Sequence, residues 1–476
     1  MNRIKINYCT CFLLAILLAS CKVPSLIKMQ DPKPVPISYN QSKDTSNIAT
    51  IKWKSFFEDP YLVALIDTAL TNNYELLSTL QNIQISKNNI RIRQSYLLPT
   101  VAGAVGLGIE KTGRYTANGA GNASTEITPG KEVPEPITDI FLGFRASWEA
   151  DIWGKLRNGK KVAVIRYLQS VEGRNFLVTN LVAEIASAYY ELLALDNQLD
   201  IIKQAIELQN NELEVVKVQK EAARATELAV KQFEAQVFNS QSQEFAIQQK
   251  IIETENTINV LLGRFPQKIT RDNVLFTSKV PKVVGSGIPS DLLTNRPDIK
   301  QAELELQAAK LDIKIARAEF YPSLGITGML GVQGFKPKYV LPTIDNLAFN
   351  FVGDLVTPFI NRVAIKATFN NANANQIASL YEYQKVVLNG YIEVYNEMSN
   401  INNLEKYYQL KRKESETLNN SIDIARDLFK SARANYLEVL TVQRDALSAK
   451  LELVEARKNQ FQSVTNIYKA LGGGWN

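Results

Sequence analysis

The sequence predicts a mainly α-helical protein that also contributes strands to a membrane β-barrel, with two copies of one structural unit in the chain. Three observations support this fold class. Residues 223–230 read ARATELAV and residues 432–439 read ARANYLEV, so five of eight positions are identical. Each stretch separates a helical pattern of nearly 70 residues from one of about 36 residues. Four further segments alternate apolar residues with small or polar ones, which is the pattern of a strand with two different faces.

The first residues predict export and a lipid anchor. Arg3 and Lys5 precede the apolar run CTCFLLAILLAS at 9–20, which is shorter than the roughly 20 residues that a membrane-spanning helix needs. The run ends in LASC at 18–21, which resembles the lipobox of bacterial lipoproteins. We therefore expect a signal peptide over 1–20, a lipid on Cys21, and a lipid-anchored N-terminal extension over 21–61. The alternative is an ordinary signal peptide with an accidental cysteine.

The composition excludes several kinds of active site. The 476 residues include no histidine, which rules out a Ser-His-Asp triad and a histidine-ligated metal site. The three cysteines, Cys9, Cys11 and Cys21, all precede residue 22, so we expect no disulfide framework in the body of the chain. The 54 basic and 48 acidic residues give a net charge of +6, too balanced to indicate a nucleic-acid partner. We expect no enzymatic activity, no metal and no cofactor.

In the first half of the chain, apolar residues recur at helical spacing in three stretches. The first covers 62–70 and 76–93 and stops at Pro99. The second covers 154–222 without a proline, and the third runs from 226 to 262 and stops at GRFP. At about 1.5 Å per residue, the second helix reaches roughly 100 Å. That length is typical of coiled coils and helical barrels rather than of a globular core.

The second half repeats this plan, with helices expected over 297–320, 362–430 and 435–471. Ser290 can cap a short helix that has Asp291 in its first turn. Pro297 suits the first position of the next helix, with Asp298 beside the positive end of the dipole. We assign the first structural repeat to 62–289 and the second to 290–476. In each repeat the two shorter helices together match the long one, so they can pack beside it end to end.

Between the first short helix and the long helix of each half, the apolar period changes from 3.6 to 2. The expected strands are 100–110 and 139–149, in the hairpin 100–149, and 323–333 and 347–355, in the hairpin 322–358. Polar loops at 115–136 and 335–345 join them. The alternation predicts that Phe144 and Phe349 face lipid and that Arg145 and Asn350 face the lumen. A half-buried strand of a soluble sheet is the alternative for any one segment, but four of them in equivalent places favour a membrane barrel.

Four strands cannot close a barrel, and lipid does not tolerate an open sheet edge. Small barrels need about eight strands, so the chain must oligomerise. Two chains would give eight strands with a filled interior, and three would give twelve strands with room for a pore. Gly, Ala and Ser on the inward faces suit an open lumen, but composition alone leaves both numbers open.

The order of elements and three motifs resemble the TolC-like outer-membrane efflux proteins. The motifs are WKSFFEDPYLVALIDTALTNNYEL at 53–76, WEADIWGKLRN at 148–158 and GIPSDLLTNRPDI at 287–299. The third resembles the lipoprotein branch that serves resistance-nodulation-division (RND) pumps. The resemblance implies a homotrimer in the outer membrane whose 12-stranded β-barrel continues as a long α-helical barrel into the periplasm. It also implies three partners: a periplasmic adaptor (membrane fusion) protein, an inner-membrane RND pump and outer-membrane lipid.

The resemblance assigns the two quoted turns to the periplasmic tips that close the tunnel. Relatives carry acidic rings in the second tip; Glu438 matches one such place, whereas Thr441 stands where the next acid is usual. Relatives of the founding type latch the tip with a tyrosine and an arginine, and the matching positions here are Phe429 and Ala434. Arg224 and Arg433 are near these turns and are candidates to replace that latch. The alternative for Glu438 is a solvated helix carboxylate.

Three functions remain open from the sequence. The first is a passive conduit: the outer-membrane component of a tripartite efflux pump that exports small molecules or drugs. The second has the same fold and serves as the exit duct of a type I protein-secretion system. The third is a lipid-anchored periplasmic coiled-coil scaffold without a pore, in which the alternating segments would be soluble. The lipobox and the motif at 287–299 favour the first.

Overall fold

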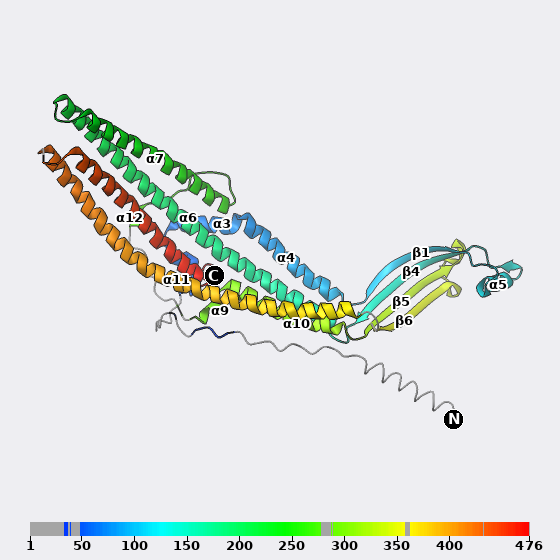
Figure 1. Ribbon diagram of the computed structural model, residues 1–476. Coiled ribbons are helices and arrows are strands. Elements are labelled where there is room, and N and C mark those ends of the chain that lie inside the picture. Colours follow the sequence, from blue (N-terminus) through cyan, green and yellow to red (C-terminus); the bar gives the residue numbers. More distant parts are fainter. Residues whose placement is uncertain are drawn as a thin grey trace. The chain divides into compact units, whose positions relative to one another are not determined.

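The structure is a computed structural model that describes residues 33–36, 39, 48–277, 287, 289–357, 362–431 and 433–475 (Figure 1). The predicted signal peptide and Cys21 lie outside the described residues. The helices are α2 (Trp53–Phe56), α3 (Pro60–Asn72), α4 (Tyr74–Ser95), α5 (Ala117–Ser124), α6 (Lys155–Glu221), α7 (Glu227–Leu261), α8 (Val274–Thr277), α9 (Asp291–Asn295), α10 (Pro297–Ala318), α11 (Val363–Lys430) and α12 (Tyr436–Ala470). The strands are β1 (Thr100–Glu110), β2 (Glu126–Thr128), β3 (Lys131–Glu132), β4 (Ile137–Ala150), β5 (Ser323–Gly334) and β6 (Leu347–Val356). Short 3-10 turns are η1 (Ile48–Thr50), η2 (Pro337–Tyr339) and η3 (Ile344–Asn346).

The chain divides into two compact units, which we describe separately. The strand unit contains Ile85–Tyr167 and Leu304–Leu380. The helix unit contains the described part of 31–84 together with Leu168–Glu303 and residues 381–475.

In the strand unit, four antiparallel strands lie side by side in the order β1-β4-β5-β6 (Figure 1). Phe144 stands opposite Leu330, which in turn stands opposite Phe349, so these three side chains share one face. Arg145 stands opposite Met329, and Met329 opposite Asn350, on the other face. The register therefore places the two phenylalanines together and Arg145 with Asn350, as the alternation predicted.

The face that carries Phe144 and Phe349 is apolar and exposed. Phe144 is 60% and Phe349 77% exposed, and the same face presents Val105, Leu107, Ile109, Leu142, Leu330, Phe351 and Leu355. A patch of this kind on a soluble protein would be unusually large, whereas a strand in lipid requires it.

The opposite face carries mostly small and polar residues, and the Phe141 ring covers part of it. Phe141 is only 4% exposed because its ring lies against Gly143 and Gly331. A Cβ on Gly143 would lie 2.5 Å from the Cα of Gly331 and 2.9 Å from the Phe141 ring, so this paired position of β4 and β5 admits only glycine. The Arg145 guanidinium lies above the same ring, 5.6 Å from its centre.

Two tryptophans hydrogen-bond the strand ends to adjacent segments of the same chain. Trp148 Nε1 donates to the carbonyl of Leu97 at 3.1 Å. Trp153 Nε1 donates to the carbonyl of Pro322 at 2.7 Å and its ring stacks on Tyr321, with 4.6 Å between the centroids. Half-exposed indoles with a satisfied N–H are typical of the boundary between lipid and water.

The first loop is more ordered than the sequence predicted. Residues 115–136 were expected as a polar loop but contain α5 and the two-stranded β2–β3 ribbon. Thr116 starts α5, because its hydroxyl accepts a hydrogen bond from the Gly119 amide at 3.1 Å. Sequence periodicity could not reveal this helix, since its residues are small and carry no apolar stripe.

In the helix unit, α7 runs back alongside α6, and α12 runs back alongside α11 (Figure 1). The largest core cluster joins α3, α6, the end of α7 and α12 around fully buried side chains such as Tyr189, Leu192, Ile258 and Tyr468. Asp59 links this core to the start of α3, since it accepts from Tyr189 Oη at 2.7 Å and from the Tyr61 amide at 2.8 Å. α6 also contains a stretch apolar enough to span a membrane, but 56% of that stretch is buried inside the protein, as in a core helix.

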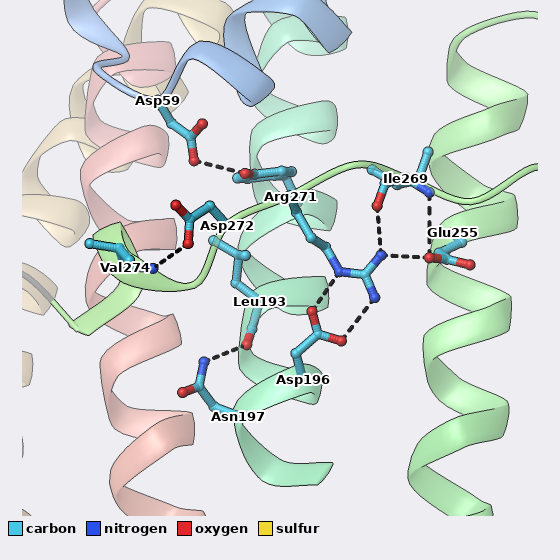
Figure 2. A network of polar contacts seen from close by, with 10 residues as sticks. Asp59, Leu193, Asp196, Asn197, Glu255, Ile269, Arg271, Asp272 and Val274 are labelled. Carbon is cyan, nitrogen blue, oxygen red and sulfur yellow. Dashed lines mark hydrogen bonds and ion pairs between the residues drawn. The ribbon is translucent and has the colours of Figure 1, made fainter. Parts of the chain in front are cut away.

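A partly buried arginine, whose side chain is 16% exposed, fixes the chain that follows α7. Figure 2 shows Arg271 between Asp196 of α6 and Glu255 of α7. It bonds Asp196 through two nitrogens at 2.5 and 2.8 Å, Glu255 at 2.5 Å, and the Ile269 carbonyl at 2.8 Å. Burial lowers the pKa of Arg271, but the two carboxylates outweigh it, so the pKa is raised and the guanidinium stays charged.

A second buried arginine explains the motif at 287–299. Arg296 is 6% exposed and forms paired bonds to Asp298 at 3.0 and 2.6 Å. Its third nitrogen bonds Glu393 of α11 at 2.6 Å and the carbonyl of Ala470, the last residue of α12, at 2.8 Å. The motif therefore joins the start of α10 to α11 and to the end of α12.

The expected helix cap at Ser290 is wrong. Ser290 precedes α9 but has helical backbone angles, φ −63° and ψ −24°, and its side chain makes no capping bond. A capping serine needs an extended backbone so that its hydroxyl can reach the free amides of the first turn. Asp298 accepts the Ile299 amide at 3.0 Å at the start of α10, as its position predicted.

The strand register leads to a test of the two faces. Cysteines that replace Arg145 and Asn350 should react with a small water-soluble thiol reagent in outer-membrane fractions, and cysteines that replace Phe144 and Phe349 should not. Phe144→Arg should cost about 2–4 kcal/mol of stability if the site lies near the middle of the bilayer. Reaction at 144 and 349 but not at 145 and 350 would show that the faces are inverted.

Candidate functional site at the two helix turns

The turn between α6 and α7 contains the first of the repeated stretches. After Glu221 the Ala223 amide donates to the Lys220 carbonyl at 2.9 Å, and the Arg224 amide donates to the Gln219 carbonyl at 2.8 Å. Ala223 takes a left-handed backbone, φ 56°, which closes the helix in the manner usually reserved for glycine. Thr226 then caps α7 by accepting the Ala229 amide at 3.2 Å.

The turn between α11 and α12 is built in the same way. The Arg433 amide donates to the Leu428 carbonyl at 2.8 Å. Asn435 caps α12 by accepting the Glu438 amide at 3.1 Å. Thr226 and Asn435 are matching positions of the two stretches, so equivalent residues make equivalent caps.

An apolar cluster holds the two turns together. It contains the buried residues Leu213, Val216, Ala229, Val230, Phe233 and Val237, and Ala225, Phe429, Tyr436 and Leu440 pack against it. We call this set the tip cluster. Phe429 thus contributes apolar packing to the tip cluster. Ala434 is half-buried in the turn and offers no side-chain hydrogen bond.

The charged residues of the turns differ in their pairing. Arg224, Arg433 and Glu438 are exposed, and within the described ranges none of the three forms an ion pair. Thr441 is exposed one turn beyond Glu438. Glu227, by contrast, pairs with Lys220, and this hydrogen bond holds its pKa below the usual value. Glu438 therefore presents an uncompensated carboxylate, whereas the charge of Glu227 is offset.

A polar junction that the sequence analysis did not predict joins α6 to α11 and α12 near the tip cluster. Glu212 of α6 accepts from Arg426 Nε of α11 at 3.1 Å and from Gln443 Nε2 of α12. Arg426 also bonds Asp423 at 3.1 Å. The Glu212 side chain is only 13% exposed, so water screens these bonds weakly. We call these residues the Glu212 junction.

The signal for this junction was present in the helical pattern of α6. Ile202, Leu213 and Val216 form a buried stripe, and Gln209 lies within it at 3% exposure. Glu212 borders the same stripe. A glutamine and a glutamate on an apolar stripe indicate buried polar partners elsewhere in the chain. The partners themselves, more than 200 residues away, carry no local mark.

The turns can therefore move apart only if two kinds of contact are lost. The tip cluster must expose apolar area, and the Glu212 junction must give up hydrogen bonds to a carboxylate. Each such bond to a charged group contributes about 1.5–3 kcal/mol. The Glu212 carboxylate binds both α11 and α12, so the Glu212 junction fixes the position of α6 against each of these two helices.

Comparisons with known proteins agree with this architecture. A family model described as outer membrane efflux protein matches residues 65–264 and 288–473. A probable efflux pump outer membrane protein of Pseudomonas putida, SepC, is 27% identical over 90% of this chain and 86% of its own. The pyoverdine export outer membrane protein OpmQ of Pseudomonas aeruginosa is also 27% identical, over 91% of this chain and 89% of its own.

Solved structures show the same fold. The open state of the MtrE outer membrane channel of Neisseria gonorrhoeae superposes with a TM-score of 0.82 at 22% identity, covering 95% of this chain and 98% of that one. The outer-membrane channel OprN gives a TM-score of 0.83 at 21% identity, covering 95% and 99%.

Removing the junction carboxylate should loosen the turns. Glu212→Ala should lower the free energy that holds the α6–α7 and α11–α12 helix pairs together by about 3 kcal/mol, because two hydrogen bonds to a charged group are lost. Hydrogen–deuterium exchange of peptides covering 205–235 and 420–445 should then be roughly 150-fold faster where local opening limits exchange. The control is Glu214→Ala, since Glu214 is 69% exposed and bonds only Lys217 among the described side chains. Equal acceleration in both variants would contradict a role for the junction.

Proposed function

The chain belongs to the outer membrane efflux protein family, and from this membership we propose that it is the outer-membrane channel of a tripartite RND-type efflux pump. In this role it is a passive conduit for small molecules or drugs, and the inner-membrane pump supplies both the energy and the substrate choice. A periplasmic adaptor protein joins the two. The observation that carries the proposal beyond family membership is the four-stranded sheet with one apolar exposed face, which suits lipid on one side and a lumen on the other.

We further propose a homotrimer with a 12-stranded barrel. Within each chain the first strand, β1, and the last, β6, pair on one side only, which leaves two sheet edges that a neighbouring chain can satisfy. The long helices would continue the barrel as a helical tunnel. In this arrangement residues 62–289 and 290–476 are the two repeats, each with one hairpin, 100–149 or 322–358, and an N-terminal extension at 21–61 precedes them.

Apolar stripes on two helices support this assembly. Phe238, Phe245 and Ile252 of α7 are 60%, 69% and 52% exposed and are spaced by seven residues. Tyr381, Leu388 and Tyr395 of α11 repeat this spacing at 62%, 58% and 41%. A seven-residue apolar repeat is the pattern of helices that pack as coiled coils. The stripes are suited to α-helices of neighbouring subunits, because they remain uncovered in the single chain.

The turns are proposed as the periplasmic gate. In a trimer each chain brings two turns to the tunnel end, where the adaptor and pump would engage them. The tip cluster and the Glu212 junction then hold the closed state, in place of the tyrosine–arginine latch whose positions are Phe429 and Ala434 here. Arg224 and Arg433, exposed at the turns, are available to contact the adaptor.

Lipidation at Cys21 is proposed from the LASC sequence that ends the apolar run. Metabolic labelling with a radioactive fatty acid should mark the wild type and leave Cys21→Ala unmarked. The variant should still reach the outer membrane, because barrel strands bury far more apolar area than acyl chains. Equal labelling of the two proteins would mean that the lipid, if any, is elsewhere.

The channel and its gate are tested together in a planar bilayer. Purified protein should give single-channel conductance that favours cations, because three copies of the unpaired Glu438 would face a narrow lumen. Glu438→Gln should weaken the cation preference and reduce block by divalent or trivalent cations.

Glu227→Gln is the matched control, since Lys220 already offsets that carboxylate. A change with Glu227→Gln alone would mean that the first turn lines the constriction. If neither variant alters selectivity, other residues line it, with Thr441 marking a departure from the acidic rings of relatives. The absence of any conductance would contradict the channel function itself.

A further inference from the structure

The helices that adjoin the sheet carry a large excess of positive charge. In the strand unit these are the segments 85–95 of α4, 155–167 of α6, 304–318 of α10 and 363–380 of α11. Together they contain 12 basic and two acidic residues, a net charge of +10, whereas the whole chain carries only +6. The rest of the chain is therefore net acidic. Positive charge concentrated in one region indicates a partner of opposite charge.

A groove along α4, α6 and α10 defines one side of these helices. Its lining includes Asn89 and Arg93 of α4, Lys155 and Gly159 of α6, and Asp312 of α10. Lys155 Nζ bonds Glu149 of β4 at 2.5 Å. Glu149 lies on the same face of the sheet as Arg145, because the two residues are four positions apart on one strand. The groove therefore opens on the Arg145 side of the strand unit.

Seven basic residues lie on the opposite side of the same helices. Each is two positions from a residue that lines the groove, as Lys87 is from Asn89 and Lys314 from Asp312. Two positions correspond to about 200° around an α-helix, so these side chains leave the helices away from the groove. We call the seven residues the basic collar: Lys87 and Arg91 of α4, Arg157 and Lys161 of α6, and Lys310, Lys314 and Arg317 of α10. The basic collar thus lies on the side of the apolar sheet face that carries Phe144.

The chain offsets little of the charge of the basic collar. Arg317 is half-buried and the other six residues are exposed. Among the described residues, only Arg157 of the seven forms an ion pair, with Asp151. The two acidic residues of the helix segments lie on the groove side, since Asp312 lines the groove and Glu305 stands seven residues before it. The remaining cations are available to a partner outside the chain.

The position of the basic collar favours a lipid surface over a protein partner. Lys87 and Lys310 lie farthest from the sheet, each eight residues or about 12 Å from the helix end that leads to a strand. Trp148 and Trp153, at the same strand ends, are typical of the boundary between lipid and water. Headgroups occupy the layer next to this boundary, and the attraction of a charged surface extends about 10 Å further. The whole basic collar is therefore within reach of an anionic membrane surface.

We propose that the basic collar binds the phosphate groups of anionic phospholipids in the leaflet that meets the helix ends of the sheet. The lysines supply point charges, and the arginines can bond two phosphate oxygens at once. A basic residue at an anionic membrane surface strengthens binding by about fivefold. The proposal rests on the proposed membrane sheet, but it requires neither efflux nor any particular exported molecule.

Tryptophan quenching in proteoliposomes measures the lipid preference. The full chain is reconstituted in phosphatidylcholine vesicles that contain some brominated lipid, because bromine on acyl chains quenches nearby tryptophans such as Trp148 and Trp153. Comparison of brominated phosphatidylglycerol with brominated phosphatidylcholine gives the relative affinity of the protein surface for the two lipids. The wild type should prefer phosphatidylglycerol by about fivefold or more at low salt. In about 1 M salt, where the screening length is about 3 Å, the preference should disappear.

Two double variants with the same loss of charge separate the basic collar from the groove. Arg91→Gln with Lys161→Gln removes two cations of the basic collar from α4 and α6, and should lower the preference for phosphatidylglycerol by about twofold or more. Arg93→Gln with Arg166→Gln removes two cations of the groove from the same helices and should leave the preference unchanged. An equal loss in the two double variants would show that net charge alone sets the preference, which would overturn the proposal.

The same vesicles separate failure of this proposal from failure of the channel function. Without quenching by brominated phosphatidylcholine, the sheet would not lie in the bilayer, and both proposals would be wrong. Quenching without a preference for phosphatidylglycerol would contradict the basic collar alone and point to an acidic protein surface as its partner. Inorganic phosphate should reduce the preference no more than sodium chloride of equal ionic strength does. A larger reduction would mean that the basic collar is a site for free phosphate.

Discussion

The structure depends on one constraint: a four-stranded sheet with an apolar outer face has two open edges that the chain itself cannot satisfy. The backbone N–H and C=O groups at the free sides of β1 and β6 need partners, and in an apolar medium water cannot supply them. The exposed phenylalanines of β6 favour a lipid environment, in which water would not hydrate those edges. Assembly with further copies, as proposed above, would satisfy these edges as well as the helices. The uncovered seven-residue stripes on α7 and α11 are consistent with the same requirement in the helix unit.

The helix unit solves a different problem, which is to hold very long helices in register. Arg271 and Arg296 do this with buried guanidinium groups that each bind two carboxylates from different segments. Such clusters are costly to bury and depend on good geometry, so they specify position more than they add stability. Arg296 fixes the end of α12, and Arg271 fixes the chain leaving α7. Because α7 and α12 are rigid helices, these two arginines also help to set the positions of the turns at the opposite ends of the same helices.

Helix and strand positions were predictable because local chemistry marks their ends. Gly263 and Gly472 take left-handed backbones two residues after the ends of α7 and α12, as is usual for a glycine that closes a helix. The strand faces followed from a period of two, which a register shift of one residue would have inverted. Features that join distant segments were not predictable, among them the Glu212 junction and the two arginine anchors. Ser290 shows the limit of a local rule: its residue type suits a cap, but its backbone is helical and its hydroxyl makes no capping bond.

The Gly143–Gly331 pair of β4 and β5 limits which substitutions the sheet can accept. Gly143 and Gly331 each stand where any side chain would collide with the partner strand and with the Phe141 ring. A mutation at one of them cannot be compensated at the other, because both already lack a side chain. Gly103 and Gly353, in the same sheet, have no atom within 4 Å of where a Cβ would lie. The glycines of this sheet therefore differ in the space that a side chain would find within the single chain, although the sequence alone does not distinguish them.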